Sequence, residues 1–446
     1  MSNKVVKVGV LVIGRKRPGF DQEWNLIMRR RAAEALESLG FTSIGAANPV
    51  VDDQTISAAL GEIRAAGCDS LIILQPSLGH GQLCAAVAQQ WPGPVVLWAT
   101  PERQESPQVS SCSLVAAHLW ASTLRQANHP FELVYGDPND DRTRQSLKQA
   151  ILLCQTTATL KRSKLGLVGT HAPGFIDMAT DPFLLRSALG IQLHTLSLPQ
   201  FIDHVRAIDE SPVKDDVARV REMNLPMTKV TADDLAMNSR YYLALRDLMH
   251  EEQLDGLALQ CWPELPNMLG QWPYLALARL TEEGRAMAME GDVDAAVTAQ
   301  VGNALQLGPG FITDWLEHDD NSITFWHPGI APISMLETAS LANHFNIVRP
   351  LVIDGPIKVD QPVTIVRLWQ CDGQYNLAAF EGQTIPMRRK LTGNTSLVAV
   401  PDRNVREYFE ELCHAGMPHH VTVFFGHHAD ALKRLARMMK VKTINS

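Results

Sequence analysis

The stretch VVKVGVLVIG, from Val5 to Gly14, is an almost unbroken apolar run that ends in glycine. Such a run is typical of a strand that is buried on both faces of a parallel sheet. The segment Trp24–Leu39 follows with helical spacing and ends before Gly40, a residue that often terminates helices. This succession predicts a βαβ unit, and therefore an α/β fold with an open doubly wound sheet.

The same alternation continues beyond Gly40. Further strands are expected at Ser43–Ala46, Ser70–Leu74, Val95–Trp98 and Phe131–Tyr135, and helices at Ile56–Ala66, Gly81–Gln90 and Ser111–Gln126. A second series has strands at Leu165–Gly169, Leu193–Leu198 and Leu257–Gln260 and helices at Ala232–Glu252 and Gln271–Arg285. Two consecutive doubly wound α/β domains are therefore expected.

From about Pro350 onward the pattern changes to short alternating runs, which indicate antiparallel strands. They lie at Leu351–Ile353, Val363–Trp369, Tyr375–Phe380 and Ser396–Val400, and a helix at Ala429–Met439 follows. The predicted domains are therefore an N-terminal α/β domain (residues 1–163), a central α/β domain (164–345) and a β-rich, barrel-like C-terminal domain (346–446).

Composition limits the classes of function. The chain of 446 residues has a formal net charge of −8. Nucleic acid and anionic membranes both call for a basic face, so neither is expected as a partner. The seven cysteines are scattered without CxxC spacing, which argues against a disulfide framework or a structural zinc site. The N-terminal sequence lacks the pattern of a signal peptide, and no stretch is long enough to span a bilayer, so a cytoplasmic protein is expected.

Three side chains in the last third of the chain are suited to a hard divalent metal. They are Glu290 in AMEGDVDAA, Asp314 in FITDW and His420 in GMPHHVTV. Glu290 and Asp314 also have a structural explanation. The acidic pair Glu290 and Asp292 precedes the apolar helical run Val293–Leu305 and could simply cap that helix. Asp314 is close in sequence to other acidic residues and could belong to an acidic surface loop. The pair His419-His420 is harder to explain in this way, because two imidazoles cannot both face an apolar core cheaply.

Other catalytic patterns are absent from the sequence. It contains no HExxH, GxSxG or GxGxxG motif, which argues against zincin, α/β-hydrolase and dinucleotide sites. The loop GTHAPGF at residues 169–175 follows an expected strand but lacks the Lys-Ser/Thr of a phosphate loop. His327, in TFWHPG, is a single histidine of a kind that is more often structural than a ligand.

Together these segments resemble the L-fucose and L-arabinose isomerase superfamily over essentially the whole chain. The segments RKRPGFD (15–21), LALQCWPEL (257–265), AMEGDVDAAVT, ITDW and GMPHHVTV stand in the family's order. The resemblance implies an aldose–ketose isomerase that works through an ene-diolate, with Glu290 and Asp314 as acid/base pair and metal ligands and His420 as the imidazole ligand. The cofactor that it implies is Mn²⁺ or another divalent metal such as Co²⁺ or Mg²⁺.

The resemblance also implies residues that bind the sugar. Gln260, His419 and His327 are expected near the substrate, and His327 is similar in placement to a further histidine ligand of arabinose isomerases. Arg17 or its neighbour Arg15 would reach a substrate from the first domain, because the family implies trimers or hexamers with active sites near subunit interfaces. The basic cluster that contains them would suit an anionic sugar, although a solvated loop explains it equally well.

Two other classes of function stay open. Two doubly wound domains around a cleft are also typical of non-catalytic sugar-binding proteins, although these do not explain the paired histidines. The same ligands could serve a metal-dependent hydrolase or lyase that acts on a sugar acid. The segments Glu102–Pro107, Pro212–Val220 and Trp262–Trp272 are expected to be loops, and they match no family motif.

Overall fold

The computed structural model describes residues 6–15, 19–45 and 48–444. The chain divides into two compact units. Unit 1 comprises residues 1–159 and 437–439, and unit 2 comprises residues 160–436 and 440–446. Val5 and Ala46, which belong to predicted strands, and Arg17, a predicted substrate contact, lie outside the described residues.

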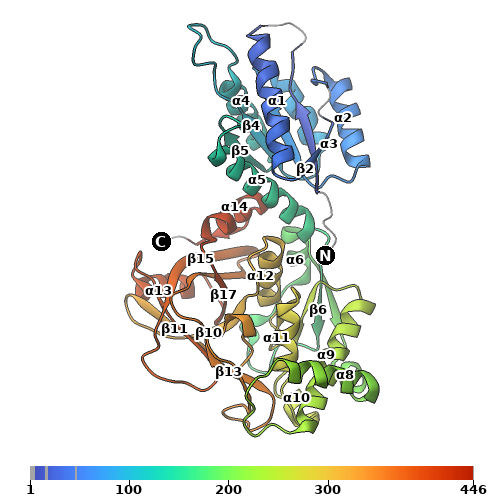
Figure 1. Ribbon diagram of the computed structural model, residues 1–446, viewed down its shortest axis with the longest axis vertical. Coiled ribbons are helices and arrows are strands. Elements are labelled where there is room, and N and C mark those ends of the chain that lie inside the picture. Colours follow the sequence, from blue (N-terminus) through green and yellow to red (C-terminus); the bar gives the residue numbers. More distant parts are fainter. Residues whose placement is uncertain (1–5, 16–18, 46–47, 445–446) are drawn as a thin grey trace. The chain divides into compact units, whose positions relative to one another are not determined.

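Unit 1 is built on a parallel sheet with the strand order β2-β1-β3-β4-β5 (Figure 1). Its strands are β1 (Val6–Val12), β2 (Phe41–Ile44), β3 (Leu71–Gln75), β4 (Val95–Ala99) and β5 (Phe131–Tyr135). Its helices are α1 (Gln22–Ser38), α2 (Asp53–Ala65), α3 (Gly81–Gln90), α4 (Ser113–Gln126) and α5 (Asp141–Leu160). Every residue of β3 and β4 is buried, which explains their uninterrupted apolar sequences and confirms the predicted parallel sheet.

One face of this sheet is covered by α2, α3 and α4. Ile63, Leu83 and Trp120, one from each helix, belong to a single apolar cluster with Leu71 and Ile73 of β3. The strand order reverses at β1, because the chain passes from β1 to β2 on one side and β3 pairs with β1 on the other. The carboxyl ends of these strands therefore lie at one edge of the sheet.

Unit 2 contains a second parallel sheet, with the order β7-β6-β8-β9. Its strands are β6 (Lys164–Val168), β7 (Gln192–Leu196), β8 (Gly256–Leu259) and β9 (Ala286–Ala288). The helices are η1 (Ile176–Met178), α6 (Pro182–Leu189), α7 (Leu198–Ala207), α8 (Glu210–Glu222), α9 (Ala232–Glu251), α10 (Glu264–Met268), α11 (Tyr274–Glu282) and α12 (Val293–Ala304).

The prediction of a loop at Pro212–Val220 is wrong, since these residues belong to α8. Pro212 lies in its first turn, where a backbone N–H has no partner within the helix. The expected loop Trp262–Trp272 likewise contains the short helix α10.

Unit 2 also contains a mostly antiparallel sheet with the order β12-β13-β16-β11-β10-β17-β14-β15-β18 and an additional pairing of β15 with β16. Its strands are β10 (Phe311–His318), β11 (Ser322–His327), β12 (Ser340–Ala342), β13 (Val352–Pro356), β14 (Pro362–Cys371), β15 (Gln374–Ile385), β16 (Asn394–Ala399), β17 (His420–Phe425) and β18 (Lys442–Thr443). The remaining helices are η2 (Ile333–Met335), α13 (Val405–His414) and α14 (Ala429–Met439). The predicted β-rich region is confirmed, and its barrel-like form stays a prediction. The sheet includes β10 and β11, which precede the predicted domain boundary after residue 345. The two boundaries between the three predicted domains stay a prediction.

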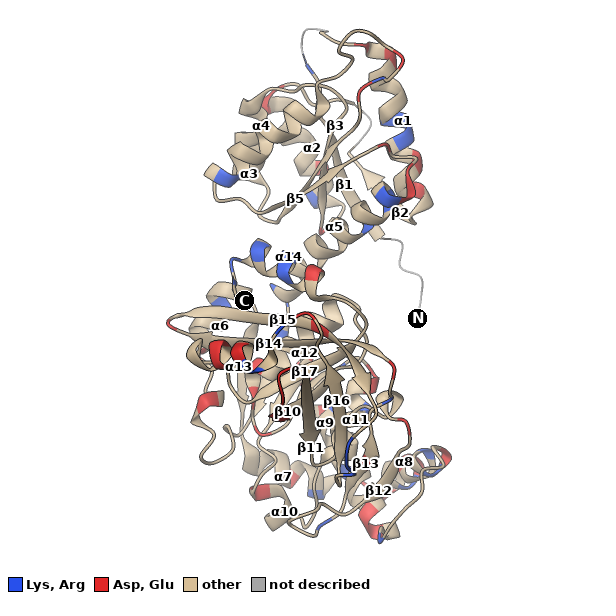
Figure 2. Cartoon of the chain, turned by 90° about the vertical axis from the view of Figure 1, so that its left-hand side faces the viewer, with Lys and Arg blue, Asp and Glu red and all other residues tan. Residues whose placement is uncertain are grey.

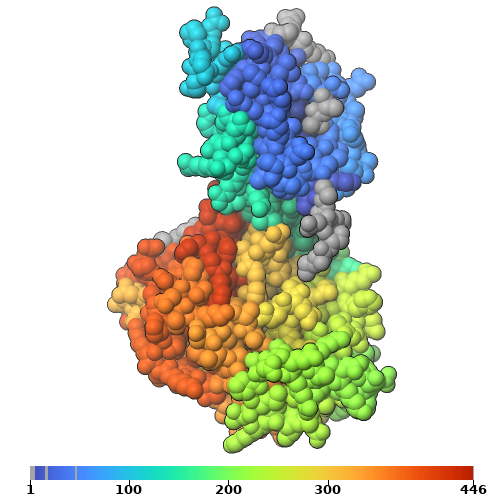
Figure 3. Space-filling view, viewed as in Figure 1, coloured from blue at the N-terminus to red at the C-terminus, as the bar shows by residue number. Residues whose placement is uncertain are grey.

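Helix α12 is the element at which the two sheets of unit 2 meet. It packs against β8 and β9 of the parallel sheet and against β14 and β17 of the antiparallel sheet. Figure 3 shows the later segments of unit 2, in orange, directly beside its earlier segments, in yellow and green. Its sequence is small and apolar, and its residues from Val293 to Gly302 are all buried. The start of α12 is therefore the place where strand ends from both sheets approach each other.

Lys and Arg are interspersed with Asp and Glu over both units (Figure 2). No helix in the described part of the chain is both long and apolar enough to cross a membrane.

Candidate active site

The three predicted metal ligands lie together near the start of α12. Glu290 follows β9, Asp314 lies on β10 and His420 begins β17. Asp314 and His420 are direct partners across the antiparallel strands, so their side chains project from the same face. The Nε2 atom of His420 lies 3.4 Å from Asp314 Oδ1 and 3.6 Å from Glu290 Oε2. Two carboxylates from distant parts of the sequence thus meet one imidazole nitrogen.

This group is largely shielded from solvent. The side chain of His420 is 1% exposed, that of Glu290 15% and that of Asp314 28%. Burial raises the pKa of Glu290 to about 7, although His420 lowers it. Burial likewise raises the pKa of Asp314. Carboxylates in such surroundings gain stability when a cation joins them, which is how a metal site behaves.

Asp292 fixes the orientation of His420. Its Oδ2 atom lies 2.9 Å from His420 Nδ1, and its two oxygens accept hydrogen bonds from Arg367 at 2.8 and 2.9 Å. All three side chains are almost completely buried. Burial alone would raise the pKa of Asp292, but Arg367 and His420 outweigh it and hold that pKa well below its usual value. An ionised Asp292 favours the proton on Nδ1, so that Nε2 of His420 presents a lone pair to Glu290 and Asp314.

The backbone around Glu290 holds its side chain at the end of β9. Glu290 has a φ of 60° and Gly291 a φ of 70°. The Glu290 carbonyl accepts a hydrogen bond from Ala172 N at 2.8 Å, and its N–H donates to the Cys261 thiol at 3.4 Å. A Cβ at position 291 would lie well inside 3.0 Å of the Thr170 carbonyl oxygen. Only glycine fits at this position.

We expect Gly291→Ala to lower the free energy of unfolding by about 1–3 kcal/mol, because the new methyl group must displace the backbone at Thr170. The same displacement should move Glu290 and reduce activity. Gly308→Ala is the matched control, since Gly308 has a similar φ of 88° but nothing within 4 Å of its added Cβ. Urea denaturation of both variants measures the difference. Equal losses of stability and activity in the two variants would show that the close approach at Gly291 is unimportant.

His327 lies at the end of β11, and its side chain is 1% exposed. Its ring centroid lies 6.0 Å from that of His420. Burial holds the pKa of His327 well below its usual value, so the imidazole is neutral. Its Nδ1 atom has no hydrogen-bond partner among the described residues. A buried, neutral imidazole nitrogen without a hydrogen-bond partner could bind a metal ion or form a hydrogen bond with a polar ligand.

His419 lies at the rim of the group. Its Nδ1 is 2.9 Å from Asp177 Oδ2, and its ring lies 5.0 Å from that of Phe175. A ligand atom of His419 also lies within 4.8 Å of ligand atoms of Glu290 and His420, so His419 competes with Asp314 as the third ligand. Asp314 lies 3.4 Å from His420 Nε2 but is not part of that group, and Asp177 engages only the Nδ1 atom of His419, so the distances leave both residues as candidates for the third ligand. The metal role of the three predicted ligands stays a prediction.

Gln260 follows β8 and is mostly buried. Its Oε1 atom accepts a hydrogen bond from Thr170 N at 2.8 Å, so Gln260 holds the loop after β6. This loop carries Phe175, whose ring stacks with that of Trp262 at a centroid distance of 6.1 Å. A contact between Gln260 and a sugar stays a prediction, as do the sugar contacts of His419 and His327.

The sequence did not identify Asp292, Arg367 or Asp177 as site residues. Asp292 was expected only as a helix cap, and it does accept a hydrogen bond from Ala295 N at 2.9 Å. Arg367 left a signal, because it is the single charged residue of the apolar run Val363–Trp369. A charge on a buried strand needs a partner. Asp177 left no comparable signal.

The chain is similar to known sugar isomerases. The family model of the L-arabinose isomerase central domain matches residues 184–308, and that of the L-fucose isomerase C-terminal domain matches residues 356–445. The sulfoquinovose isomerase of Priestia aryabhattai is 26% identical over 442 residues, which cover 97% of each chain. The chain belongs to the L-fucose/L-arabinose isomerase superfamily.

Other members of this superfamily match smaller parts of the chain. The sulfoquinovose isomerase of Alkalicoccus urumqiensis is 24% identical over 82% of this chain and 83% of its own. The L-arabinose isomerase of Thermotoga maritima is 27% identical over 29% of this chain and 27% of its own. Glu290 lies in the region matched by the arabinose isomerase model, and His420 lies in the region matched by the fucose isomerase model. Asp314 lies between the two matched regions.

Proposed function

We propose that this protein is a divalent-metal-dependent isomerase that interconverts an aldose and a ketose. The observation that carries the proposal is the meeting of Glu290, Asp314 and His420 Nε2 in a shielded site. The isomerase names of the relatives support it. The reaction moves a proton between C1 and C2 through an ene-diolate, so it needs groups that exchange a proton and a positive charge beside O1 and O2.

The donor set fits a metal of the Mn²⁺, Co²⁺ or Mg²⁺ type, because it combines carboxylate oxygens with one imidazole nitrogen. Glu290, Asp314 and His420 would hold the ion, and His327 offers a further unpartnered nitrogen nearby. When bound, the ion would supply charge stabilisation for the two substrate oxygens. Asp292 and Arg367 would keep His420 from turning its Nε2 away.

Glu290 and Asp314 would act as the acid/base pair. Both have a raised pKa, which brings their protonation equilibria closer to neutral pH and suits proton exchange with a carbon acid. Both lie within 3.6 Å of the same imidazole nitrogen, so one bound sugar could meet both carboxyl groups. Burial of the group would limit the access of water to the ene-diolate. Gln260 and His419 would bind sugar hydroxyl groups.

Sulfoquinovose, a sugar that carries a sulfonate, is the first substrate to assay, because a relative that covers 97% of this chain is a sulfoquinovose isomerase. The proposal includes a cytoplasmic homo-oligomer, a trimer or hexamer with active sites near subunit interfaces.

Metal removal tests the proposal. Protein stripped with EDTA is expected to be inactive, and Mn²⁺ should restore the conversion of an aldose to a ketose. In D₂O the product should carry deuterium at the exchanged carbon, as detected by NMR. Tight binding of Mn²⁺ without deuterium exchange in any of a panel of sugars would favour a hydrolase or lyase. Failure to bind any divalent metal would leave a non-catalytic sugar-binding protein.

A further inference from the structure

An imidazole and a carboxylate that the proposed proton transfer between C1 and C2 does not use lie at the rim of the site in unit 2. His419 Nδ1 lies 2.9 Å from Asp177 Oδ2, although the two residues are 242 positions apart in the chain. Asp177 belongs to η1 in the loop after β6, and His419 directly precedes β17. The folded chain therefore builds a carboxylate–imidazole pair from Asp177 and His419, which we call the rim pair.

The loop that carries the carboxylate of the rim pair is held on both sides of Asp177. Before it, Ala172 N donates a hydrogen bond to Glu290 O at 2.8 Å. After it, Asp181 N donates to Oε1 of Gln370 at 2.8 Å. The carboxylate is therefore anchored, as a group that orients an imidazole must be.

The imidazole of the rim pair lies beside the candidate metal ligands. The ring centroid of His419 lies 4.5 Å from that of His420 and 5.0 Å from that of Phe175. A nitrogen of His419 lies within 4.8 Å of ligand atoms of Glu290 and His420. The side chain of His419 is 37% exposed, whereas that of His420 is 1% exposed. A sugar that enters from solvent and reaches Glu290 therefore also comes within reach of His419.

Hexoses in water are mostly cyclic hemiacetals, whereas isomerisation between C1 and C2 needs the open-chain carbonyl form. Opening the ring requires a proton to leave the hydroxyl group on C1. The electron pair of that O–H bond then forms the second bond of the carbonyl group. The bond between C1 and the ring oxygen breaks, and the ring oxygen keeps its electron pair and takes up the proton. One base that becomes the acid can serve both oxygens, because both are bonded to C1.

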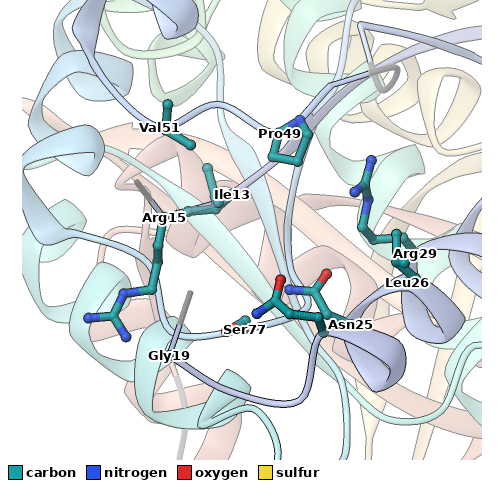
Figure 4. A pocket seen from close by; sticks show the side chains of 11 residues that line it. Ile13, Arg15, Gly19, Asn25, Leu26, Arg29, Pro49, Val51 and Ser77 are labelled. Atoms are coloured by element: carbon teal, nitrogen blue, oxygen red, sulfur yellow. The ribbon is translucent and has the colours of Figure 1, made fainter. Parts of the chain in front are cut away.

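The rim pair has the groups that this reaction needs. A carboxylate at Nδ1 favours the proton on that nitrogen, so that Nε2 of His419 presents a lone pair. Nε2 can accept the proton from the hydroxyl group on C1 and return it to the ring oxygen. By contrast, the pocket of about 260 Å³ after β1 in unit 1 (Figure 4) has no imidazole or carboxyl group among its described lining residues.

We propose that the rim pair opens and closes the ring of a cyclic aldose, with His419 Nε2 as the proton carrier and Asp177 as the residue that positions it. Closure onto the other face of the carbonyl group gives the other anomer, so the protein also catalyses mutarotation. This second activity rests on the sugar binding of the proposed function, but it needs neither a metal nor proton transfer between C1 and C2. It leaves the metal to Glu290, Asp314 and His420, because a nitrogen bound to a metal cannot carry the proton.

Anomer exchange in the full-length, metal-free protein tests the inference. EDTA removes the metal on which isomerisation depends, and NMR exchange spectroscopy follows the interconversion of the α and β anomers. The probes are sulfoquinovose and L-arabinose, the sugars that the names of the relatives contain. The unmodified protein should raise the exchange rate of at least one of them at least about tenfold above the rate in buffer. No acceleration with either sugar would overturn the inference.

Variants of the rim pair assign the activity. His419→Gln should return the exchange rate to that in buffer. Asp177→Asn should lower the acceleration at least about tenfold, because the amide no longer favours the proton on Nδ1. Asp177→Glu keeps a carboxylate and should retain more of the acceleration than Asp177→Asn.

His427→Gln is the matched control. His427 Nδ1 also lies 2.9 Å from a carboxylate oxygen, that of Glu381, but beyond the other end of β17. Its loss should change the exchange rate less than about twofold. Equal losses of anomer exchange in His427→Gln and His419→Gln would overturn the inference.

Thermal unfolding and Mn²⁺ titration separate this role from a structural one and from metal binding. Because His419 is partly exposed, His419→Gln should keep the unfolding midpoint and the Mn²⁺ affinity of the unmodified protein. A loss of Mn²⁺ affinity as large as that of Asp314→Asn would mean that His419 is a metal ligand, and it would overturn the inference.

The two activities can fail separately. A protein that isomerises a sugar with Mn²⁺ but shows no anomer exchange without metal would contradict the inference and leave the proposed function in place. A protein that exchanges anomers through His419 but isomerises no sugar with any divalent metal would contradict the proposed function instead.

Discussion

Replacing Glu290 by glutamine should lower kcat by about 10³-fold or more, and Asp314→Asn should do the same. The amide keeps the size of the side chain, but it cannot take up the substrate proton and is a weaker ligand for a divalent cation. Steady-state kinetics with Mn²⁺ and a sugar substrate measures the loss. Titration with Mn²⁺ in the absence of sugar should show weaker binding by both variants, which gives a second readout that does not depend on turnover.

Glu317→Gln is the control for Asp314→Asn. It lies on the same strand, is 52% exposed and pairs with Arg389 at 3.1 Å, so its loss should change kcat less than about twofold. A kcat for Glu290→Gln or Asp314→Asn that is similar to that of Glu317→Gln would contradict the proposed acid/base pair.

The stability of the Glu290→Gln variant shows whether its loss of activity is catalytic or results from unfolding. Burial raises the pKa of Glu290 to about 7, above its usual value of 4.5, so the fold favours the protonated form. As pH rises from 4.5 through 7, ionisation of Glu290 removes stability from the metal-free protein. The neutral amide avoids this loss. The metal-free Glu290→Gln variant should therefore be at least as stable as the unmodified protein above pH 7, as measured by thermal unfolding in the presence of EDTA.

The sequence predicted elements best where apolar runs are bounded by turn or capping residues. The bounds of β5, α3 and α14 agree with the prediction residue by residue. Helix α8 was missed because its buried face consists of only Val213, Asp216 and Val220. Asp216 is buried because Arg279 binds it, and this partner is 63 residues away. A pattern of apolar spacing cannot detect a helix whose inward face includes a paired charge.

The site shows the same limit. Glu290, Asp314 and His420 were identified from their short sequence segments, and the structure brings them together. Asp292 looked like a cap because its local role is that of a cap. Its other partners, His420 and Arg367, are 128 and 75 residues away, so only the folded chain places them in contact. Local sequence therefore predicted the three side chains that lie together here, but not the pair that orients His420.

Arg367→Met should be strongly destabilising. The change leaves the carboxylate of Asp292 buried beside His420 without its cation, and breaking a buried pair in this way costs about 3–5 kcal/mol. It should also weaken Mn²⁺ binding by about 10–100-fold, because the Asp292 carboxylate loses the two hydrogen bonds that fix it and so no longer holds the His420 imidazole firmly in the orientation that presents Nε2. Denaturant unfolding and Mn²⁺ titration measure the two effects separately.

The double variant Arg367→Met/Asp292→Asn separates folding from positioning. It removes both buried charges, so much of the lost stability should return. The added Asp292→Asn change removes the carboxylate at His420 Nδ1, so Mn²⁺ affinity should stay about 10–100-fold below that of the unmodified protein. Recovery of both quantities in the double variant would mean that the Arg367–Asp292 pair serves only stability.

The pair of Arg279 and Asp216 provides the matched control for this variant. It has the same bidentate geometry, with distances of 2.7 and 2.8 Å, and its side chains are 10% and 1% exposed. It lies between α11 and α8 rather than beside His420. Arg279→Met should therefore lose stability in the same range while binding Mn²⁺ normally, since the Asp216 carboxylate orients no imidazole. A similar loss of Mn²⁺ affinity in both single variants would mean that general destabilisation, and not the orientation of His420, explains the effect of Arg367.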